Sequence, residues 1–125
     1  MNKSTLAVVF PVLLASCRAA PNQVQHFPIK QSPNYISVET FYGYGPVSSD
    51  YTRVFYVQAK KDVDEQKLFV ISGDYLVVEK IIKLDVNRVL ICISKGNVDR
   101  LNRRINLINE KIISIVEFTF SRQCS

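Results

Sequence analysis

Alternating apolar and polar residues and short apolar runs predict strands along this chain. Residues 35–42 alternate strictly, with Ile36 and Val38 on one side of an extended segment. Residues 51–59 have a similar content of β-branched and aromatic side chains, and a loop that contains glycine and proline joins the two segments, so we expect a hairpin with a long tip. Three further segments are apolar enough to be strands: residues 67–71, 87–94 and 112–120.

Two other segments suggest helices. In residues 75–84 the polar side chains fall within one narrow sector of a helical wheel; the valines and isoleucines favour a strand, and between these two alternatives we lean slightly to a helix. Residues 97–111 are the better candidate, because apolar residues recur there at helical spacing. These residues are Val98, Leu101, Ile105 and Ile108. The elements together predict an α+β domain, with a mostly antiparallel sheet of about five strands and one or two packed helices.

The first part of the chain differs from the rest. Residues 6–14 form an uncharged apolar run behind one positive charge, Lys3, and the run is too short to span a bilayer. Residues 18–34 contain three prolines and little periodicity, which is typical of a tether. The predicted organisation is a signal peptide at residues 1–16, a lipidated cysteine and flexible tether at 17–34, and one domain at 35–125.

Residues 14–17, Leu-Ala-Ser-Cys, resemble the lipobox of bacterial lipoproteins. In that family a diacylglycerol is joined to the cysteine through a thioether, a signal peptidase cuts before it, and the new amino terminus is acylated, commonly with palmitate. The resemblance covers only the first 17 residues and implies that Cys17 carries the lipid. Because Arg18 stands where an aspartate favours inner-membrane retention, the resemblance implies a periplasm-facing anchor in the outer membrane.

Ordinary secretion is the alternative interpretation of this leader. A cut after Ala19 would remove Cys17 and release a soluble protein. The two interpretations differ in whether the domain stays attached to a membrane.

Cys92 and Cys124 remain if Cys17 is lipidated or removed. An exported protein folds where disulfides persist, so we expect these two cysteines to be bonded. The bridge would stabilise the fold by about 3–4 kcal/mol in the chain-entropy estimate. The cysteines show neither a CxxC motif nor a metal-ligand spacing, so we expect no metal and no cofactor.

Composition and charge limit the classes of partner that this protein is expected to bind. The 125 residues are 47% hydrophobic and 22% charged, which is typical of a globular protein. The formal net charge is +5, and the basic residues are scattered along the chain. Nucleic-acid binders usually show a basic stripe or a known motif, so we do not expect a nucleic-acid partner.

The catalytic candidates are weak. His26, the sole histidine, lies in the predicted tether, where it would lack the fixed orientation that a general base needs. Glu39 and Glu117 lie in predicted strands and could pair, although strand carboxylates more often face solvent. We therefore expect a protein that is not an enzyme.

Two sets of residues suggest a contact surface. Tyrosines surround the Gly/Pro loop and combine rigid area with a polar end, although half of the rings there could be hairpin core. Arginines lie on or near the outer face of the predicted helix 97–111. The candidate contact residues are Tyr42, Tyr44, Tyr51, Arg100 and Arg104.

The function that fits these features is a non-enzymatic protein-binding module in the bacterial envelope. It would be an inhibitor or immunity protein, or an accessory subunit of an envelope assembly, with a toxin, an enzyme or another envelope protein as its partner. One alternative is a structural lipoprotein that links the membrane to a secretion or conjugation machine. In that case the helix face around Arg100, Arg103 and Arg104 would be the dock. The second alternative is a soluble secreted effector, cleaved near Ala19.

The predicted anchor can be tested by intact mass spectrometry of the protein from bacterial membranes. We expect a chain that begins at Cys17 and carries added acyl mass, because two or more acyl chains make a stable anchor. A Cys17→Ala variant should carry no lipid. A soluble, unacylated wild-type chain that begins near Ala20 would contradict the anchor and favour secretion.

Overall fold

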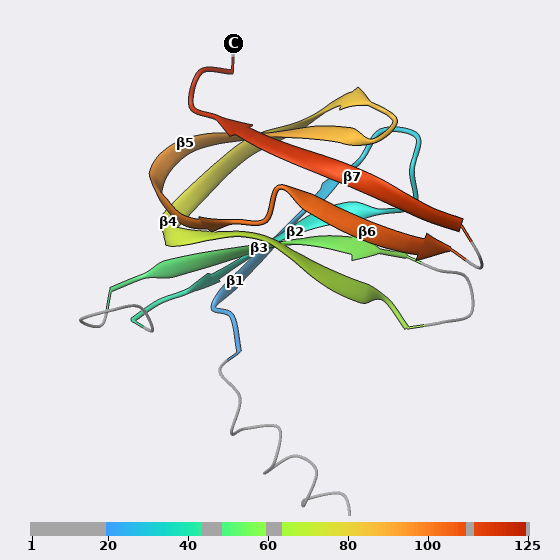
Figure 1. Ribbon diagram of the computed structural model, residues 1–125. Coiled ribbons are helices and arrows are strands. Elements are labelled where there is room, and N and C mark those ends of the chain that lie inside the picture. The colour runs from blue at the N-terminus through green and yellow to red at the C-terminus, as the bar shows by residue number, and fades with distance from the viewer. Residues whose placement is uncertain (1–19, 44–48, 60–63, 110–111, 125) are drawn as a thin grey trace, which may run out of the picture.

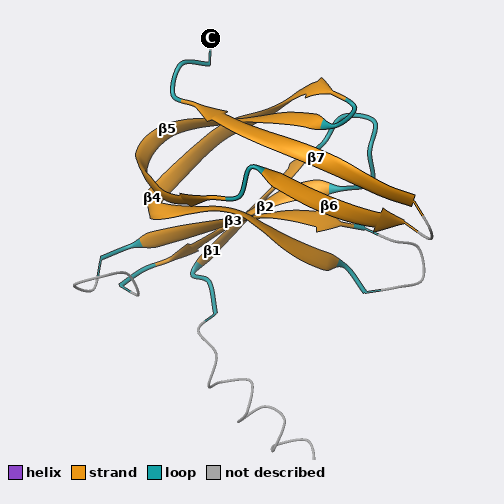
Figure 2. Ribbon diagram, in the orientation of Figure 1, coloured by secondary structure: helices purple, strands orange, loops and turns teal. Residues whose placement is uncertain are grey.

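A computed structural model describes residues 20–43, 49–59, 64–109 and 112–124, and its regular elements are all strands (Figures 1 and 2). The strands are β1 (Gln23–Pro28), β2 (Tyr35–Phe41), β3 (Tyr51–Gln58), β4 (Gln66–Asp85), β5 (Arg88–Leu101), β6 (Arg104–Asn109) and β7 (Ile112–Ser121). They form one seven-stranded sheet in the order β1-β2-β3-β4-β5-β7-β6. The pair β5–β7 is parallel and the other pairs are antiparallel. The expected α+β class is therefore wrong, because the described chain is all-β.

The sheet folds over on itself because β4 and β5 are long and bent (Figure 1). β4 has 20 residues and β5 has 14. The first part of β4 pairs with β3 and with the end of β5, whereas its second part pairs with the start of β5. The first layer therefore holds β1, β2, β3 and the start of β4, and the second layer holds the end of β4, the start of β5, β7 and β6.

The hydrophobic core lies between these two layers. Alternate residues of β2, β3, β5 and β7 point into it, as expected for strands that each have one buried face. The rings of Tyr56 on β3 and Phe118 on β7 meet edge to face with centroids 5.6 Å apart, which joins the layers directly. The most buried members are Ile36, Val38, Val54, Val70, Ile71, Leu76, Ile91, Ile93 and Phe118.

Two glycines allow the bend. A Cβ atom on Gly73 would lie 2.1 Å from the backbone oxygen of Asn97, and a Cβ on Gly96 would lie 2.6 Å from the backbone oxygen of Asp74. Gly96 also has a φ of 99°, a backbone conformation that residues other than glycine rarely adopt. The backbones of β4 and β5 thus touch at a point where no side chain fits.

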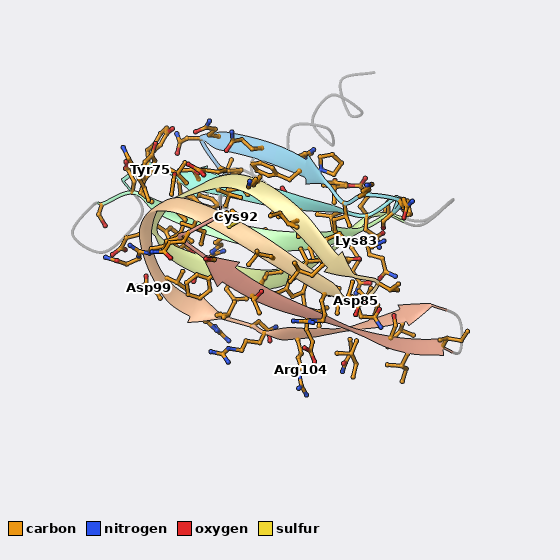
Figure 3. All side chains as sticks on the ribbon, turned by 90° about the horizontal axis from the view of Figure 1, so that it is seen from above. Tyr75, Lys83, Asp85, Cys92, Asp99 and Arg104 are labelled. Atoms are coloured by element: carbon orange, nitrogen blue, oxygen red, sulfur yellow. A yellow bond between two sulfur atoms is a disulfide. The ribbon has the colours of Figure 1, made fainter. Side chains whose placement is uncertain are left out.

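A buried threonine stabilises the same bend. The hydroxyl of Thr52 on β3 is fully buried and accepts a hydrogen bond from the amide of Leu76 at 3.0 Å. Tyr75, just before Leu76, has a φ of 40° and lies at the bend in the middle of β4. In Figure 3 it lies at the opposite side of the molecule from Lys83. The threonine supplies a partner to a backbone group where the register between β4 and β5 is interrupted.

The helix expected at residues 75–84 is wrong, and a β-bulge explains the misleading pattern. The register of β4 against β5 shifts between Val78 and Lys80, so Glu79 is an extra residue. A bulge places two consecutive polar residues on the exposed side, and Glu79 and Lys80 are both exposed. Two adjacent polar residues in an apolar segment imitate the period of a helix.

The helix expected at residues 97–111 is also wrong. This segment contains the end of β5, a turn at Asn102 and Arg103, and β6. The inward residues of β6 are Ile105 and Leu107, two apart, whereas Ile108 is 58% exposed. The helical spacing was therefore produced by two strands on either side of a turn, and the isoleucines and asparagines there are poor helix formers.

Strand β1 falls within the segment where the prolines predicted a tether. Its six residues pair with β2 from Gln23 opposite Thr40 to Pro28 opposite Tyr35. β1 is an end strand of the sheet, so proline at its last position costs no interior ladder bond. Residues 23–28 therefore belong to the sheet and not to a flexible tether. The predicted signal peptide and Cys17 lie outside the described residues.

The expected disulfide between Cys92 and Cys124 is confirmed. Cys92 is almost fully buried on β5, and its Cα lies 5.9 Å from that of Cys124, which follows β7. The bond closes a sequence separation of 32 residues and fixes the end of the chain to the second layer.

The bend generates a stability prediction. Gly73→Ala should lower the free energy of unfolding by about 3 kcal/mol, because the added methyl overlaps a backbone atom that cannot rotate away. Chemical denaturation measures this loss. Ser94→Ala, an exposed change on β5, is the control and should cost less than about 0.5 kcal/mol. Equal stability of the two variants would show that the two backbones do not meet as described.

Candidate functional site

Aromatic and cationic side chains share the outer face of the first layer. Strand pairing places Phe41 opposite Tyr51, and Phe55 opposite Phe69. The rings of the first pair stack with centroids 5.6 Å apart, and those of the second meet edge to face at 6.2 Å. These four rings lie together on the outer side of β2, β3 and β4, where Tyr51, Phe55 and Phe69 are partly exposed and Phe41 is 6% exposed.

Three cations lie over these rings. The Arg53 guanidinium carbon lies 5.8 Å from the Phe41 centroid and 5.2 Å from the Tyr51 centroid. The Arg100 guanidinium carbon is 5.4 Å from the Phe69 centroid, and Lys67 Nζ is 5.7 Å from the Phe55 centroid. Such cation–π contacts orient the charges without neutralising them.

A surface hollow of about 450 Å³ lies at the centre of this face. It is lined by Tyr51, Arg53, Phe55, Phe69, Ser72 and Arg100. Two of these six residues are positively charged and none is acidic. We call this region the aromatic–cationic hollow.

Acidic residues nearby already have partners. Glu39 is 6% exposed, and Lys67 Nζ lies 2.6 Å from its Oε2. Tyr35 donates a hydrogen bond to Glu65 at 2.5 Å. This hydrogen bond, with smaller contributions from burial and from the Glu65 charge, raises the pKa of Tyr35 to about 12. The Tyr35 phenol is therefore neutral at physiological pH.

The structure brings together two of the five predicted contact residues, Tyr51 and Arg100, in the aromatic–cationic hollow. Tyr42 lies outside the hollow, 43% exposed, and its hydroxyl donates a hydrogen bond to Gln23 on β1 at 3.1 Å. Tyr44 lies outside the described residues.

Arg104 belongs to a different surface. It lies at the start of β6, and its Nε is 3.4 Å from Glu117 Oε1. Both residues line a separate hollow of about 320 Å³ with Arg88 and Asp85, so this region has no excess of one charge. Figure 3 shows Arg104 on the side of the molecule away from Tyr75. The expected helix face that carries Arg100, Arg103 and Arg104 together does not exist.

Four residues of the hollow were missed from the sequence: Arg53, Phe55, Phe69 and Ser72. Arg53 and Phe55 alternate with the core residues Val54 and Tyr56, which places both on the outward face of β3. Only the pairing of β3 with β4 and of β4 with β5 brings them together. A period-two comparison of aromatic and basic residues on successive strands is the signal that could have found part of this set.

The strand carboxylates do not form a catalytic pair. Glu39 is bound to Lys67 in the first layer, and Glu117 is bound to Arg104 in the second. His26 lies on β1, where its ring contacts that of Tyr35 in a tilted arrangement, with centroids 4.5 Å apart. Within the described residues, no three histidine, cysteine or acidic side chains lie close enough to hold a metal ion. No helix of that same part of the chain is long and apolar enough to cross a membrane.

No family model, no curated protein and no solved structure matches this chain. The geometry of the site is therefore the basis for its functional interpretation.

The contact between Lys67 and Glu39 gives a second stability prediction. Lys67→Met should lower the free energy of unfolding by about 1–2 kcal/mol, because the buried Glu39 carboxylate loses its partner while the lysine itself is half exposed. Adding Glu39→Gln to this variant should restore most of the loss, since the buried charge is then removed. Denaturation of the two single variants and the double variant measures the coupling. Additive effects would contradict the pairing.

Proposed function

We propose that this protein is a lipid-anchored, non-enzymatic protein-binding module of the bacterial envelope. Its contact surface is the aromatic–cationic hollow, and its partner presents an acidic segment. The observation that carries the proposal is the placement of two arginines over aromatic rings around one hollow that contains no acidic residue.

The composition of this surface supports a protein contact. Tyrosine and arginine are the residues most often found at the energetic centre of protein interfaces, with tryptophan. Tyr51, Phe55 and Phe69 provide flat apolar area that loses little conformational entropy on binding, because their rings already contact one another or a cation. A partner would meet a surface that is largely ordered in advance.

The charges support an acidic partner. A guanidinium matches a carboxylate with two parallel hydrogen bonds, and both Arg53 and Arg100 are exposed. A partner with aspartate or glutamate beside an apolar residue would satisfy the charges and cover the rings. The hollow would favour such a segment over a neutral or basic one.

The envelope location rests on the leader and on the disulfide. The lipobox-like residues 14–17 supply the expected anchor, and the bond between Cys92 and Cys124 is of a kind that persists in oxidising compartments such as the periplasm. An inhibitor, an immunity protein and an accessory subunit all fit this description. They differ in the identity of the partner.

A photo-crosslinking residue at Ser72, which lines the hollow, tests the proposal in the host cell. We expect a specific crosslink to one envelope protein, whose crosslinked segment is acidic. With the purified pair, Arg53→Glu and Arg100→Glu should each weaken binding by about tenfold or more, because each replaces attraction by repulsion at the contact.

Lys80→Glu is the matched control. Lys80 is exposed on the second layer, and its substitution changes the net charge by the same amount as Arg53→Glu or Arg100→Glu. It should alter the affinity by less than about threefold once salt screens distant charges. Equal weakening by all three variants would indicate general electrostatic attraction and reject the site. Unchanged binding in Arg53→Glu and Arg100→Glu would reject it as well.

A further inference from the structure

A third hollow opens at the end of the sandwich, lined by residues of the loop 29–34 between β1 and β2 and of the turn between β4 and β5. Figure 1 shows this loop and this turn beside each other. Lys83 Nζ donates a hydrogen bond to the backbone oxygen of Lys30 at 3.2 Å and so joins the two segments. The hollow has a volume of about 230 Å³ and shares no lining residue with the aromatic–cationic hollow. We call it the end hollow.

The floor of the end hollow is apolar. Ile29, Val89, Leu107 and Val116 line it, and each is less than a tenth exposed. They come from the loop after β1 and from β5, β6 and β7, so the floor is part of the core between the layers. Val86, which is 78% exposed, stands at the rim.

The rim of the end hollow is polar and ordered. The side-chain amide of Asn34 donates to the Tyr56 hydroxyl at 2.8 Å, and its oxygen accepts from the amide of Ala59 at 3.0 Å. The Ser32 hydroxyl accepts from the amide of Asn34 at 3.1 Å, which leaves its own hydrogen for another acceptor. These bonds hold the polar groups of the loop at fixed positions beside the apolar floor.

Lys83 supplies the charge of the end hollow. Among the described residues that line it, Lys83 alone is charged at neutral pH. An ammonium has three donors, and only one of them is directed at Lys30. Figure 3 shows Lys83 near the end of β4, with Asp85 close by. Asp85 is not among the lining residues and lines the hollow around Arg104 instead.

We propose that the end hollow binds a small carboxylate with a short apolar chain. The carboxylate would accept hydrogen bonds from the Lys83 ammonium and the Ser32 hydroxyl, and the chain would cover Leu107 and Val116. The hollow is smaller than the range of about 300–1,000 Å³ that suits drug-sized ligands. A cavity of about 150 Å³ takes benzene, so a chain of about four to six carbons is the expected size. This proposal does not depend on the protein-binding face.

Methyl NMR of the purified protein with hexanoate as the probe tests the proposal. We expect saturable shifts at the methyl groups of Val89, Leu107 and Val116, with a Kd on the order of 1 mM for a ligand of so few atoms. 1-Hexanol has the same chain without the charge, and it should bind about fivefold more weakly because it loses the charge-assisted hydrogen bond. Shifts that do not saturate at these three residues would overturn the proposal.

Two lysine variants separate a built site from general charge attraction. Lys83→Gln should weaken hexanoate binding about fivefold and leave 1-hexanol binding unchanged, because only the carboxylate uses the ammonium. Lys80→Gln, on the same strand but outside the hollow, should change neither. The methyl spectrum without ligand shows that both variants are folded. Equal affinities of the wild type for hexanoate and 1-hexanol, or equal effects of the two variants, would also overturn the proposal.

Discussion

The close approach of β4 and β5 at their glycines is the constraint on which the rest of this structure depends. Gly73 meets the backbone of Asn97, and Gly96 meets the backbone of Asp74, at distances that exclude a Cβ atom. Both strands bend there, so one continuous sheet becomes two layers that face each other across a core. Without the bend, Phe118 and Tyr56 would lie on distant parts of one open sheet, and their apolar surface would stay exposed to water.

The same bend determines the surfaces. Because the end of β5 crosses into the first layer, Arg100 lies opposite Ser72 and reaches the rings of β3 and β4. Arg104 follows only four positions later but lies in the second layer, where it pairs with Glu117. At the far end of the sandwich the two layers do not close completely, and the loop that follows β1 forms the rim of the remaining opening. The positions of both proposed sites therefore depend on the bend of β4 and β5, although the two sites share no lining residue.

Much of the local structure could be predicted from the sequence. Alternation identified β2, β-branched and aromatic content identified β3, and apolar runs identified β7 and parts of β4 and β5. It failed in residues 75–84, where the bulge at Glu79 changed the period, and in residues 97–111, where a turn at Asn102 separated two strands. Of the candidate contact residues, Tyr51 and Arg100 lie together in the hollow. Their partners Arg53 and Phe69 could not be chosen, because the choice requires the register between strands.

The sequence by itself predicted the pairing of Cys92 with Cys124, on the expectation of export and of a lipidated or removed Cys17, and it predicted strands with one apolar face. Those properties are local or depend on residue counts. Only the tertiary structure decided that the chain is all-β, that β1 joins the sheet and that the arginines separate onto two surfaces. The reason is physical: a bulge, a bend and a strand register are set by contacts between residues far apart in the chain, which a pattern along one segment does not contain.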